Sequence, residues 1–230
     1  MPASPECRSV VVVPVKHGDV AKSRLASVAG ARRAELARAF AADCVTAARA
    51  SAAVTDVVAV TDDGAARAVL EALGVIVVAD APDCGLNPAL EHGAAFARSR
   101  LGRCRVTVLS ADLPALRPEE LTAALAAAGG FDRAFVADTA ATGTTLLTAA
   151  PDIALDPRFG IASRAAHHHS GAVELESLRA PGLRRDVDTE VDLWDAVRIG
   201  VGAYTAAVLT TMTPAGVPSL HHPAVRPPRG

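Results

Sequence analysis

The sequence is poor in lysine and in aromatic residues, and it has no excess of positive charge. Only two of its 23 basic residues are lysines, Lys16 and Lys22, and 25 acidic residues bring the formal net charge to −2. The basic residues are scattered, so the chain offers no cationic stripe to a nucleic acid backbone. Aromatic residues make up 3% of the chain, which leaves few side chains on which bases could stack.

Long apolar runs and patterned cysteines are also missing. No apolar run approaches the roughly 20 residues that a membrane span needs, and the first ten residues lack the basic and then apolar order of a signal peptide. We therefore expect a cytoplasmic protein that does not bind membranes. The four cysteines show no C-x-x-C pair or regular spacing, which argues against a zinc site and against a disulfide framework.

What is present is an alternation of short β-branched runs with Ala/Leu/Arg segments of helical period. Strands are predicted at 9–15, 56–63, 75–80 and 105–114, and helices between them at 31–50, 64–73 and 88–101. Such alternation is typical of right-handed βαβ crossovers and a mostly parallel sheet. A length of 230 residues suits one α/β domain.

The second half of the chain is less regular. It contains a predicted helix at 118–128, short strands at 133–138, 144–150 and 172–178, and a helix at 189–200, with long joins between them. We expect an inserted antiparallel element here and one domain over residues 8–204. Residues 213–230 carry clustered Pro and Gly without periodicity, so we predict a disordered tail.

The loop after the first strand is the strongest candidate for phosphate binding, because ligands of open α/β sheets bind at the carboxyl ends of the strands. It holds both lysines, Lys16 and Lys22, together with Arg24. A lysine supplies a compact point charge, which suits a triphosphate better than the planar arginine fork does. The alternative is that two lysines fell on a solvated loop by chance. The loop does not match G-x-x-x-x-G-K-[ST], which excludes a Walker-type cradle.

Two aspartates are candidate metal ligands. Asp112 follows a fully apolar strand, and Asp186 precedes the last predicted helix, for which Asp188 or Thr189 would serve as the N-cap. Carboxylates on separate loops suit Mg²⁺, which usually takes one or two of them together with phosphate oxygens. Asp112 could instead be an ordinary turn or cap residue.

Three further segments combine glycine with polar side chains. In "DCGLNPALEHG", Asn87 either caps a helix that has Pro88 at its first position or reads a nucleobase edge. "TGTTLL" and "RFGIAS" present the anion-binding candidates Thr144, Gly160 and Ser163, and Ser163 is expected to open a helix. Residues 167–169 are three successive histidines that would face different ways on a helix, so we expect them at the surface.

The order of these motifs resembles one family. "VPVK…AKSRL", "GLNPAL", "LSADLP", "VAD…TGTTLL", "PRFG..S…H..SGAVEL" and "LRRDVDT..DL" follow one another as in the CofC/FbiD guanylyltransferases of coenzyme F420 biosynthesis, over about residues 10–204. The resemblance implies a single-domain, Rossmann-like nucleotidyltransferase fold of the GT-A type, a three-layer sandwich shared with the molybdenum-cofactor guanylyltransferases.

The activity that this resemblance implies is transfer of GMP from GTP to phosphoenolpyruvate, giving enolpyruvyl-diphospho-guanosine and pyrophosphate. The downstream F420 transferase that takes the product is an implied partner. Related acceptors, namely 2-phospho-L-lactate, 3-phosphoglycerate or a molybdopterin, remain alternatives, as does a non-catalytic nucleotide-binding protein.

The resemblance also assigns roles to residues. It implies Mg²⁺ on Asp112 and Asp186, which would be catalytic together with Lys22. The implied GTP contacts are Lys16, Lys22, Arg24 and Asn87, and the implied acceptor contacts are Thr144, Gly160 and Ser163. Two loops depart from the family pattern: Ala140-Ala141 stands where a glycine is usual, and Ile161-Ala162 stands where a proline often follows. The acceptor therefore stays open at this point.

Overall fold

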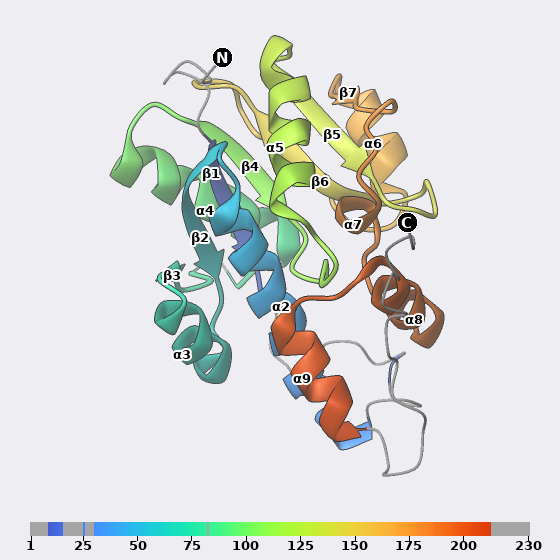
Figure 1. The fold of residues 1–230 in the computed structure, drawn as a ribbon. Helices are drawn as coiled ribbons and strands as arrows, with labels where there is room; N and C mark the ends of the chain where they lie inside the picture. Colours follow the sequence, from blue (N-terminus) through green and yellow to red (C-terminus); the bar gives the residue numbers. More distant parts are fainter. Residues whose placement is uncertain (1–8, 16–24, 26–29, 82, 213–230) are drawn as a thin grey trace, which may run out of the picture.

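The computed structural model describes residues 9–15, 25, 30–81 and 83–212, and their strands form one seven-stranded sheet (Figure 1). In chain order the strands are β1 (Ser9–Pro14), β2 (Val54–Val60), β3 (Ile76–Val78), β4 (Arg105–Leu109), β5 (Arg133–Ala137), β6 (Thr144–Ala149) and β7 (Val173–Glu174). The predicted tail at 213–230 lies outside the described residues.

The strand order across the sheet is β3-β2-β1-β4-β6-β5-β7. Strands β1 to β4 pair in parallel, β6 runs antiparallel to both β4 and β5, and β7 is again parallel to β5. Thus β6 is the inserted antiparallel element, and the predicted α/β fold with a mostly parallel sheet is confirmed.

Helices cover both faces of this sheet (Figure 1). They are α2 (Arg33–Ala50), α3 (Gly64–Ala72), α4 (Leu86–Leu101), α5 (Pro118–Ala127), α6 (Ser163–His169), α7 (Pro181–Arg184), α8 (Glu190–Ile199) and α9 (Ala203–Met212), with short 3-10 turns η3 (Gly30–Arg32) and η4 (Ala128–Gly130). The side chains of β1 alternate between the layers, because Val11 and Val13 pack with α2, α3 and α5, whereas Val10 and Val12 pack with α4.

Helix α4 approaches the sheet unusually closely at Gly93. A Cβ atom built on this glycine would lie 2.6 Å from Cγ1 of Val12 and 2.8 Å from Cγ2 of Val60. Both distances are shorter than real Cβ contacts, so only glycine fits without a shift. This close packing fixes the start of α4 over the carboxyl ends of β1 and β2.

Helix α9 was not predicted from the sequence, and the expected domain boundary at residue 204 falls inside it. The buried carboxylate of Asp43, on α2, accepts hydrogen bonds from the backbone amides of Tyr204 (3.0 Å) and Thr205 (2.8 Å). These bonds satisfy amides that the first turn of α9 leaves unpaired. Gly202 makes the approach possible, since a Cβ there would collide with the same carboxylate.

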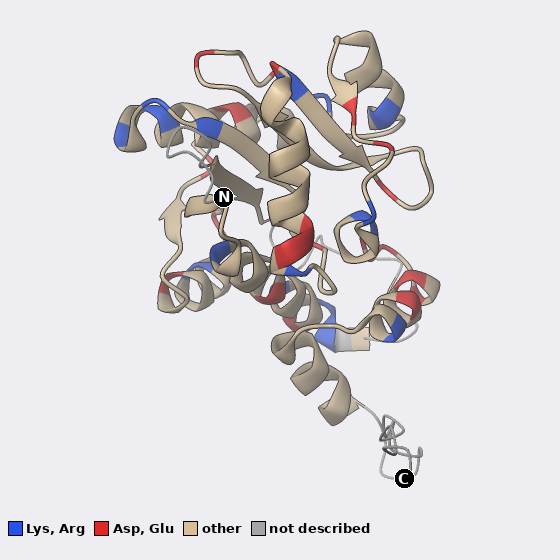
Figure 2. Ribbon diagram, turned by 45° about the horizontal axis from the view of Figure 1, so that its top comes forward, with Lys and Arg blue, Asp and Glu red and all other residues tan. Residues whose placement is uncertain are grey.

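Charged residues are distributed over separate elements of the described structure. Figure 2 shows basic and acidic segments interspersed on helices of both layers and on the joining loops. None of the helices in the described part of the chain is both long and apolar enough to cross a bilayer.

Candidate functional site

The candidate residues that the structure describes gather at one edge of the sheet. The carboxyl ends of β1 to β5 and the amino end of β6 share this edge, because β6 alone runs the opposite way there. Segments carrying Asp112, Asp138 and Thr144 follow or begin these strands. Ligands of such sheets bind at this edge, so polar side chains from separate loops can contact the same ligand there.

Asp112 and Asp186 lie on neighbouring loops. The backbone amide of Val187 donates a hydrogen bond of 3.0 Å to the carbonyl oxygen of Asp112, which joins the loop after β4 to the segment before α8. The flanking residues Leu113 and Val187 are fully buried, while both aspartates are half-buried. The contact anchors two carboxylate-bearing residues side by side, as a shared cation site requires.

Asp192, another acidic residue of this segment, helps to cap helix α8. Thr189 is the N-cap of α8, as expected for Asp188 or Thr189, and it forms a capping box with Asp192. Asp192 also pairs with Arg185 at 3.0 Å. Burial acts to raise the pKa of Asp192, but hydrogen bonds from Thr189 and the charge of Arg185 outweigh it, so this pKa lies below its ordinary value.

Asp138 shapes the loop that leads into Thr144. Its carboxylate accepts hydrogen bonds from the backbone amides of Thr142 (2.9 Å) and Gly143 (2.8 Å). A Cβ atom on Gly143 would collide with this carboxylate. Thr144 is 7% exposed at the first position of β6. The turn therefore delivers a nearly buried hydroxyl to the edge of the sheet.

Backbone hydrogen bonds connect this loop with its neighbours. The amide of Arg164, in α6, donates to the carbonyl of Thr142 (3.1 Å), and the amide of Thr139 donates to the carbonyl of Arg184 (2.9 Å). The segment leading to Asp186 and the start of α6 are thus both attached to the loop after β5. Thr144, Ser163 and Asp186, which are far apart in the sequence, come from loops that are bonded to one another.

Asn87 does not cap α4, contrary to one sequence expectation. The helix begins at Leu86 with Gly85 as N-cap, so Pro88 is its third residue and not its first. The Asn87 amide instead reaches the loop before α6, where its Oδ1 accepts from the amide of Phe159 (2.9 Å) and its Nδ2 donates to the carbonyl of Phe159 (3.1 Å). Its role as a GTP contact stays a prediction.

The loop held by Asn87 carries two of the predicted acceptor contacts. Gly160 has a φ of 129°, which favours glycine, and the amide of Ser163 donates to the Gly160 carbonyl at 3.2 Å. Helix α6 begins at Ser163, as predicted, and Ser163 is buried. The preceding Ala162 adopts the left-handed conformation with φ 56°, so a non-glycine residue occupies a position that is strained for it.

The expectation of three surface histidines is wrong for His167. This residue is fully buried, whereas His168 and His169 are exposed. Its Nδ1 lies 2.9 Å from Oγ1 of Thr144, and its Nε2 accepts a hydrogen bond of 3.0 Å from the backbone amide of Arg158. The sequence contained one signal for this: Ser163 and His167 are four residues apart, so they share a face of a helix.

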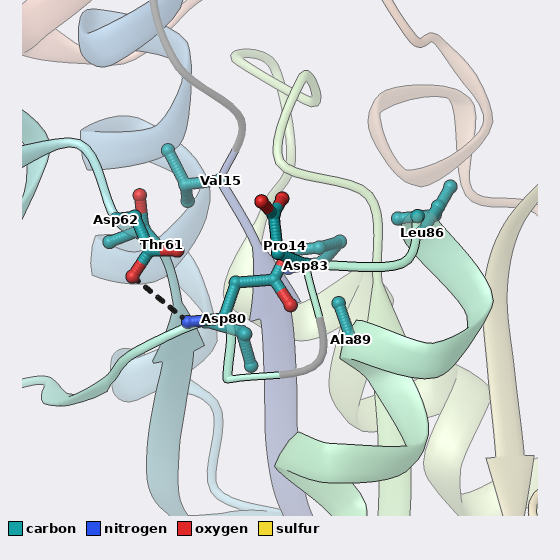
Figure 3. Close-up of a pocket in the computed structure, with 10 residues that line it drawn as sticks. Pro14, Val15, Thr61, Asp62, Asp80, Asp83, Leu86 and Ala89 are labelled. Atoms are coloured by element: carbon teal, nitrogen blue, oxygen red, sulfur yellow. Dashed lines mark hydrogen bonds between the residues drawn. The ribbon is translucent and has the colours of Figure 1, made fainter.

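A cavity of about 290 Å³ opens beside these loops, between the carboxyl ends of β1, β2 and β3 and the first turn of α4 (Figure 3). Its apolar lining includes Val15, Leu86 and Ala89, and its polar lining is acidic, namely Asp62, Asp80 and Asp83. Asp62 accepts the backbone amide of Asp80 at 3.1 Å. From the sequence, no role was assigned to any of these three carboxylates.

Lys16, Lys22 and Arg24 lie outside the described residues, so their assignment to a triphosphate stays a prediction. The segment that precedes them is described: the amide of Val15 donates to the carbonyl of Val60 at 2.9 Å, and Pro14 and Val15 line the cavity. The chain therefore leaves β1 for this loop at the wall of the cavity.

Comparison with known sequences identifies close relatives over most of the chain. Residues 9–215 match the family described as Guanylyl transferase CofC like. A phosphoenolpyruvate guanylyltransferase from Thermomonospora curvata is 54% identical over 202 residues, covering 88% of this chain and 89% of that protein. One of the same description from Streptomyces coelicolor is 54% identical over 207 residues, covering 90% of this chain and 98% of that protein.

Solved structures resemble the fold at low sequence identity. A crystal structure described as a nucleotide-diphospho-sugar transferase, from Desulfovibrio desulfuricans G20, superposes with a TM-score of 0.64 at 21% identity, covering 88% of this chain and 94% of that one. A 4-diphosphocytidyl-2C-methyl-D-erythritol synthase gives a TM-score of 0.52 at 13% identity, covering 84% and 98%. At these identities the likeness concerns the nucleotidyltransferase-like fold alone.

Proposed function

The chain belongs to the CofC family of guanylyltransferases, and from that membership we propose that it transfers GMP from GTP to phosphoenolpyruvate. An oxygen of the acceptor phosphate forms a bond to the α-phosphorus of GTP, and the bond from that phosphorus to the β-phosphate bridging oxygen breaks. The products are enolpyruvyl-diphospho-guanosine and pyrophosphate. The first is passed to the F420 transferase of coenzyme F420 biosynthesis, which is the protein partner we propose.

This reaction depends on electrostatic stabilisation of its anionic substrates more than on proton transfer. A phosphate monoester is largely ionised at neutral pH, because its second pKa is about 6, so the nucleophile requires no general base. GTP and phosphoenolpyruvate together bring several negative charges to one site, and their mutual repulsion must be lowered. Lys16, Lys22 and Arg24 are the residues proposed to hold the triphosphate and the departing pyrophosphate.

Asp112 and Asp186 are the residues that would hold Mg²⁺. They fit this role because hard carboxylate oxygens are its preferred protein ligands, and because the bond from the Val187 amide to the Asp112 carbonyl holds the two residues on adjoining loops. This contact is the observation that carries the proposal. The bound cation would supply positive charge to offset the charge that develops on the transferred phosphoryl group.

The acidic cavity is the place we propose for the guanosine part of GTP. Its lining carboxylates, Asp62, Asp80 and Asp83, would repel a triphosphate but can accept hydrogen bonds from guanine N–H groups and ribose hydroxyls. Among the described residues Oδ1 of Asp80 is buried without a hydrogen-bond partner, so it needs a donor. A volume of about 290 Å³ suits part of a nucleotide and not all of it.

The acceptor is proposed to lie across the edge of the sheet from this cavity. Thr144, Gly160 and Ser163 come from the two loops that Asp138 and Asn87 hold in place. Hydroxyls and backbone amides in such turns bind phosphate and carboxylate oxygens. The Asp112 and Asp186 loops connect to the same region through Thr139 and Arg184, so nucleotide and acceptor would meet there.

Pyrophosphate release with GTP, Mg²⁺ and phosphoenolpyruvate tests this proposal. Asp112→Asn removes negative charge at nearly constant shape, so we expect release to fall by at least about 100-fold with an unchanged circular dichroism spectrum. Asp188→Asn is the matched control, since this exposed residue lies two positions beyond Asp186, and it should keep near wild-type activity. Undiminished release by Asp112→Asn would defeat the metal assignment.

A further inference from the structure

Two side chains, the half-buried Asn87 and the buried His167, hold the loop that carries Gly160, and His167 also contacts Thr144. Asn87 bonds both backbone groups of Phe159, and His167 accepts the amide of the adjacent Arg158. His167 is packed between aromatic rings, with its centroid 5.6 Å from that of Phe135 and 5.1 Å from that of Phe159. Its imidazole is therefore fixed in orientation, and both of its nitrogens have defined partners.

The identity of one partner settles the tautomer of His167. A backbone amide can only donate, so the nitrogen facing Arg158, Nε2, must be the one without a proton. The neutral imidazole then carries its proton on Nδ1. If the proton sat on Nε2, two N–H groups would face each other across the 3.0 Å that separates Nε2 from the Arg158 nitrogen.

The neutral form is also the one favoured by the surroundings. Burial first, then the positive charge of Arg133 and to a lesser degree that of Arg158, lowers the pKa of His167 to about 4. Asp156 and a backbone hydrogen bond of Ser163 oppose this shift without reversing it. The imidazole is accordingly uncharged at neutral pH, and the tautomer argument applies to the working enzyme.

The tautomer fixes the direction of the hydroxyl of Thr144. Because Nδ1 of His167 donates, Oγ1 of Thr144 accepts at 2.9 Å, and the single proton of the hydroxyl must point elsewhere. Among the described residues, the side chain of His167 is the hydrogen-bond partner of this oxygen. Thr144 is only 7% exposed, and leaving a hydroxyl proton there without an acceptor costs free energy. An oxygen of an anionic ligand would serve as that acceptor.

We propose that His167 is a positioning residue that makes Thr144 an obligatory hydrogen-bond donor to an oxygen of the acidic acceptor. It does so without touching the acceptor, because its Nδ1–H occupies one of the two lone pairs of Oγ1 and leaves the hydroxyl proton to point away from His167, toward the ligand. Together with Asn87 it also holds the Arg158–Phe159 backbone against which Gly160 and Ser163 are placed. The inference rests on the proposed function, and it explains why the hydroxyl of Thr144 at the start of β6 acts as a hydrogen-bond donor.

Two substitutions separate the two hydrogen bonds of His167. The amide nitrogen of Asn lies two bonds from Cβ, as Nδ1 does, so His167→Asn can still donate to Thr144 but no longer accepts from Arg158. The amide of Gln reaches three bonds from Cβ, as Nε2 does, so His167→Gln can accept from Arg158 but no longer donates to Thr144. Each loses one bond, and their melting temperatures should fall alike.

The predicted difference is in KM for the acceptor. His167→Gln should raise KM for phosphoenolpyruvate about tenfold, as expected for a weakened hydrogen bond to a charged ligand, with KM for GTP unchanged. His167→Asn should change KM for phosphoenolpyruvate less than about threefold by the same reasoning. In a Thr144→Val background, which has no hydroxyl to orient, His167→Gln should add little. Equal effects of Gln and Asn, or an undiminished Gln effect in that background, would overturn the proposal.

A second measurement does not depend on activity. Long-range ¹H–¹⁵N spectra of the ¹⁵N-histidine-labelled protein assign the proton of a buried imidazole to one nitrogen. The proposal requires it on Nδ1 of His167, and a proton on Nε2 would refute it. If the wild-type protein released no pyrophosphate with any acid, the proposed function would fail, whereas the spectrum would still decide how Thr144 is oriented.

Discussion

Nδ1 of His167 lies 2.9 Å from Oγ1 of Thr144, and this contact joins the helix after one candidate acceptor loop to the strand after the other. The two residues are brought together by loops that are themselves bonded through Thr142 and Arg164. The proposed acceptor side of the site is therefore one connected structure, and we expect a change at the buried histidine to alter it.

The first prediction concerns stability against pH. The pKa of His167 is about 4 in the folded protein and about 6.5 in the unfolded chain. The unfolded state therefore binds the extra proton between these values, and the stability that the neutral imidazole confers is present above pH 6.5 and lost as pH falls toward 4. From pH 7 to pH 5 we expect the free energy of unfolding to drop by about 2 kcal/mol from this group.

Urea unfolding of wild type and His167→Asn at both pH values measures this effect. The groups that face His167 include Arg133 and Arg158, whose charges do not change in this range, and Asp156, whose pKa is lowered by the hydrogen bonds of the same two arginines against the effect of burial. The variant should show a pH dependence weaker by about 2 kcal/mol. The same slope in both proteins would mean that His167 is not buried neutral.

The second prediction concerns the two alanines with left-handed backbone. Ala162 has φ 56° and Ala141 has φ 58°, and both stand where the chain departs from the family pattern. Glycine has no Cβ and adopts this conformation without the steric strain that alanine carries. Ala162→Gly should therefore stabilise the protein by about 1 kcal/mol, which raises Tm by about 2–4 °C. The control is Ala165→Gly, an exposed position within α6, which should lower stability by up to about 1 kcal/mol. A loss of stability in both variants would contradict the backbone assignment.

The third prediction concerns the cavity. Asp80→Asn replaces a buried acceptor by a group that can present a donor, so KM for GTP should rise about tenfold while KM for phosphoenolpyruvate stays the same. Asp152→Asn serves as a remote control, because this aspartate forms an exposed pair with Arg103. Should Asp80→Asn instead raise KM for phosphoenolpyruvate alone, the cavity would belong to the acceptor.

The fourth prediction concerns the packing of α4. Gly93→Ala places a methyl group against Val12 and Val60, so it should cost about 1–3 kcal/mol of stability, as measured by urea unfolding. Gly64→Ala is the comparison, since nothing lies within 4 Å of the added atom there. If Gly93→Ala were as stable as wild type, α4 would not approach the sheet this closely.

Much of the fold could be predicted from local patterns. The β-branched runs at β1, β2 and β4 and the helical periods between them depend on short-range preferences. The irregular second half predicted an inserted antiparallel element, but not that this element is β6 between β4 and β5. Helix α9 was missed because its start depends on Asp43, which lies 161 positions before Tyr204. A cap supplied from another helix leaves no local signal.

The residues of the candidate site could be predicted where a polar side chain stands at the end of a strand. They could not be predicted where their position depends on tertiary packing. Asp112 and Thr144 stand at strand ends and could be singled out from the sequence. His167 could be singled out only through its four-residue spacing from Ser163, because three successive histidines look alike until the helix is packed on Phe135. Asn87 was placed on the helix terminus by its type, whereas its amide reaches a segment 72 residues away.

The most direct test is the mass of the products formed from GTP and Mg²⁺ with each of phosphoenolpyruvate, 2-phospho-L-lactate and 3-phosphoglycerate, trapped by the downstream F420 transferase where the conjugate is unstable. The proposed function predicts a guanosine diphosphate conjugate of enolpyruvate, with one pyrophosphate for each GTP consumed. Absence of any conjugate, or hydrolysis of GTP without an acid in the product, would contradict it.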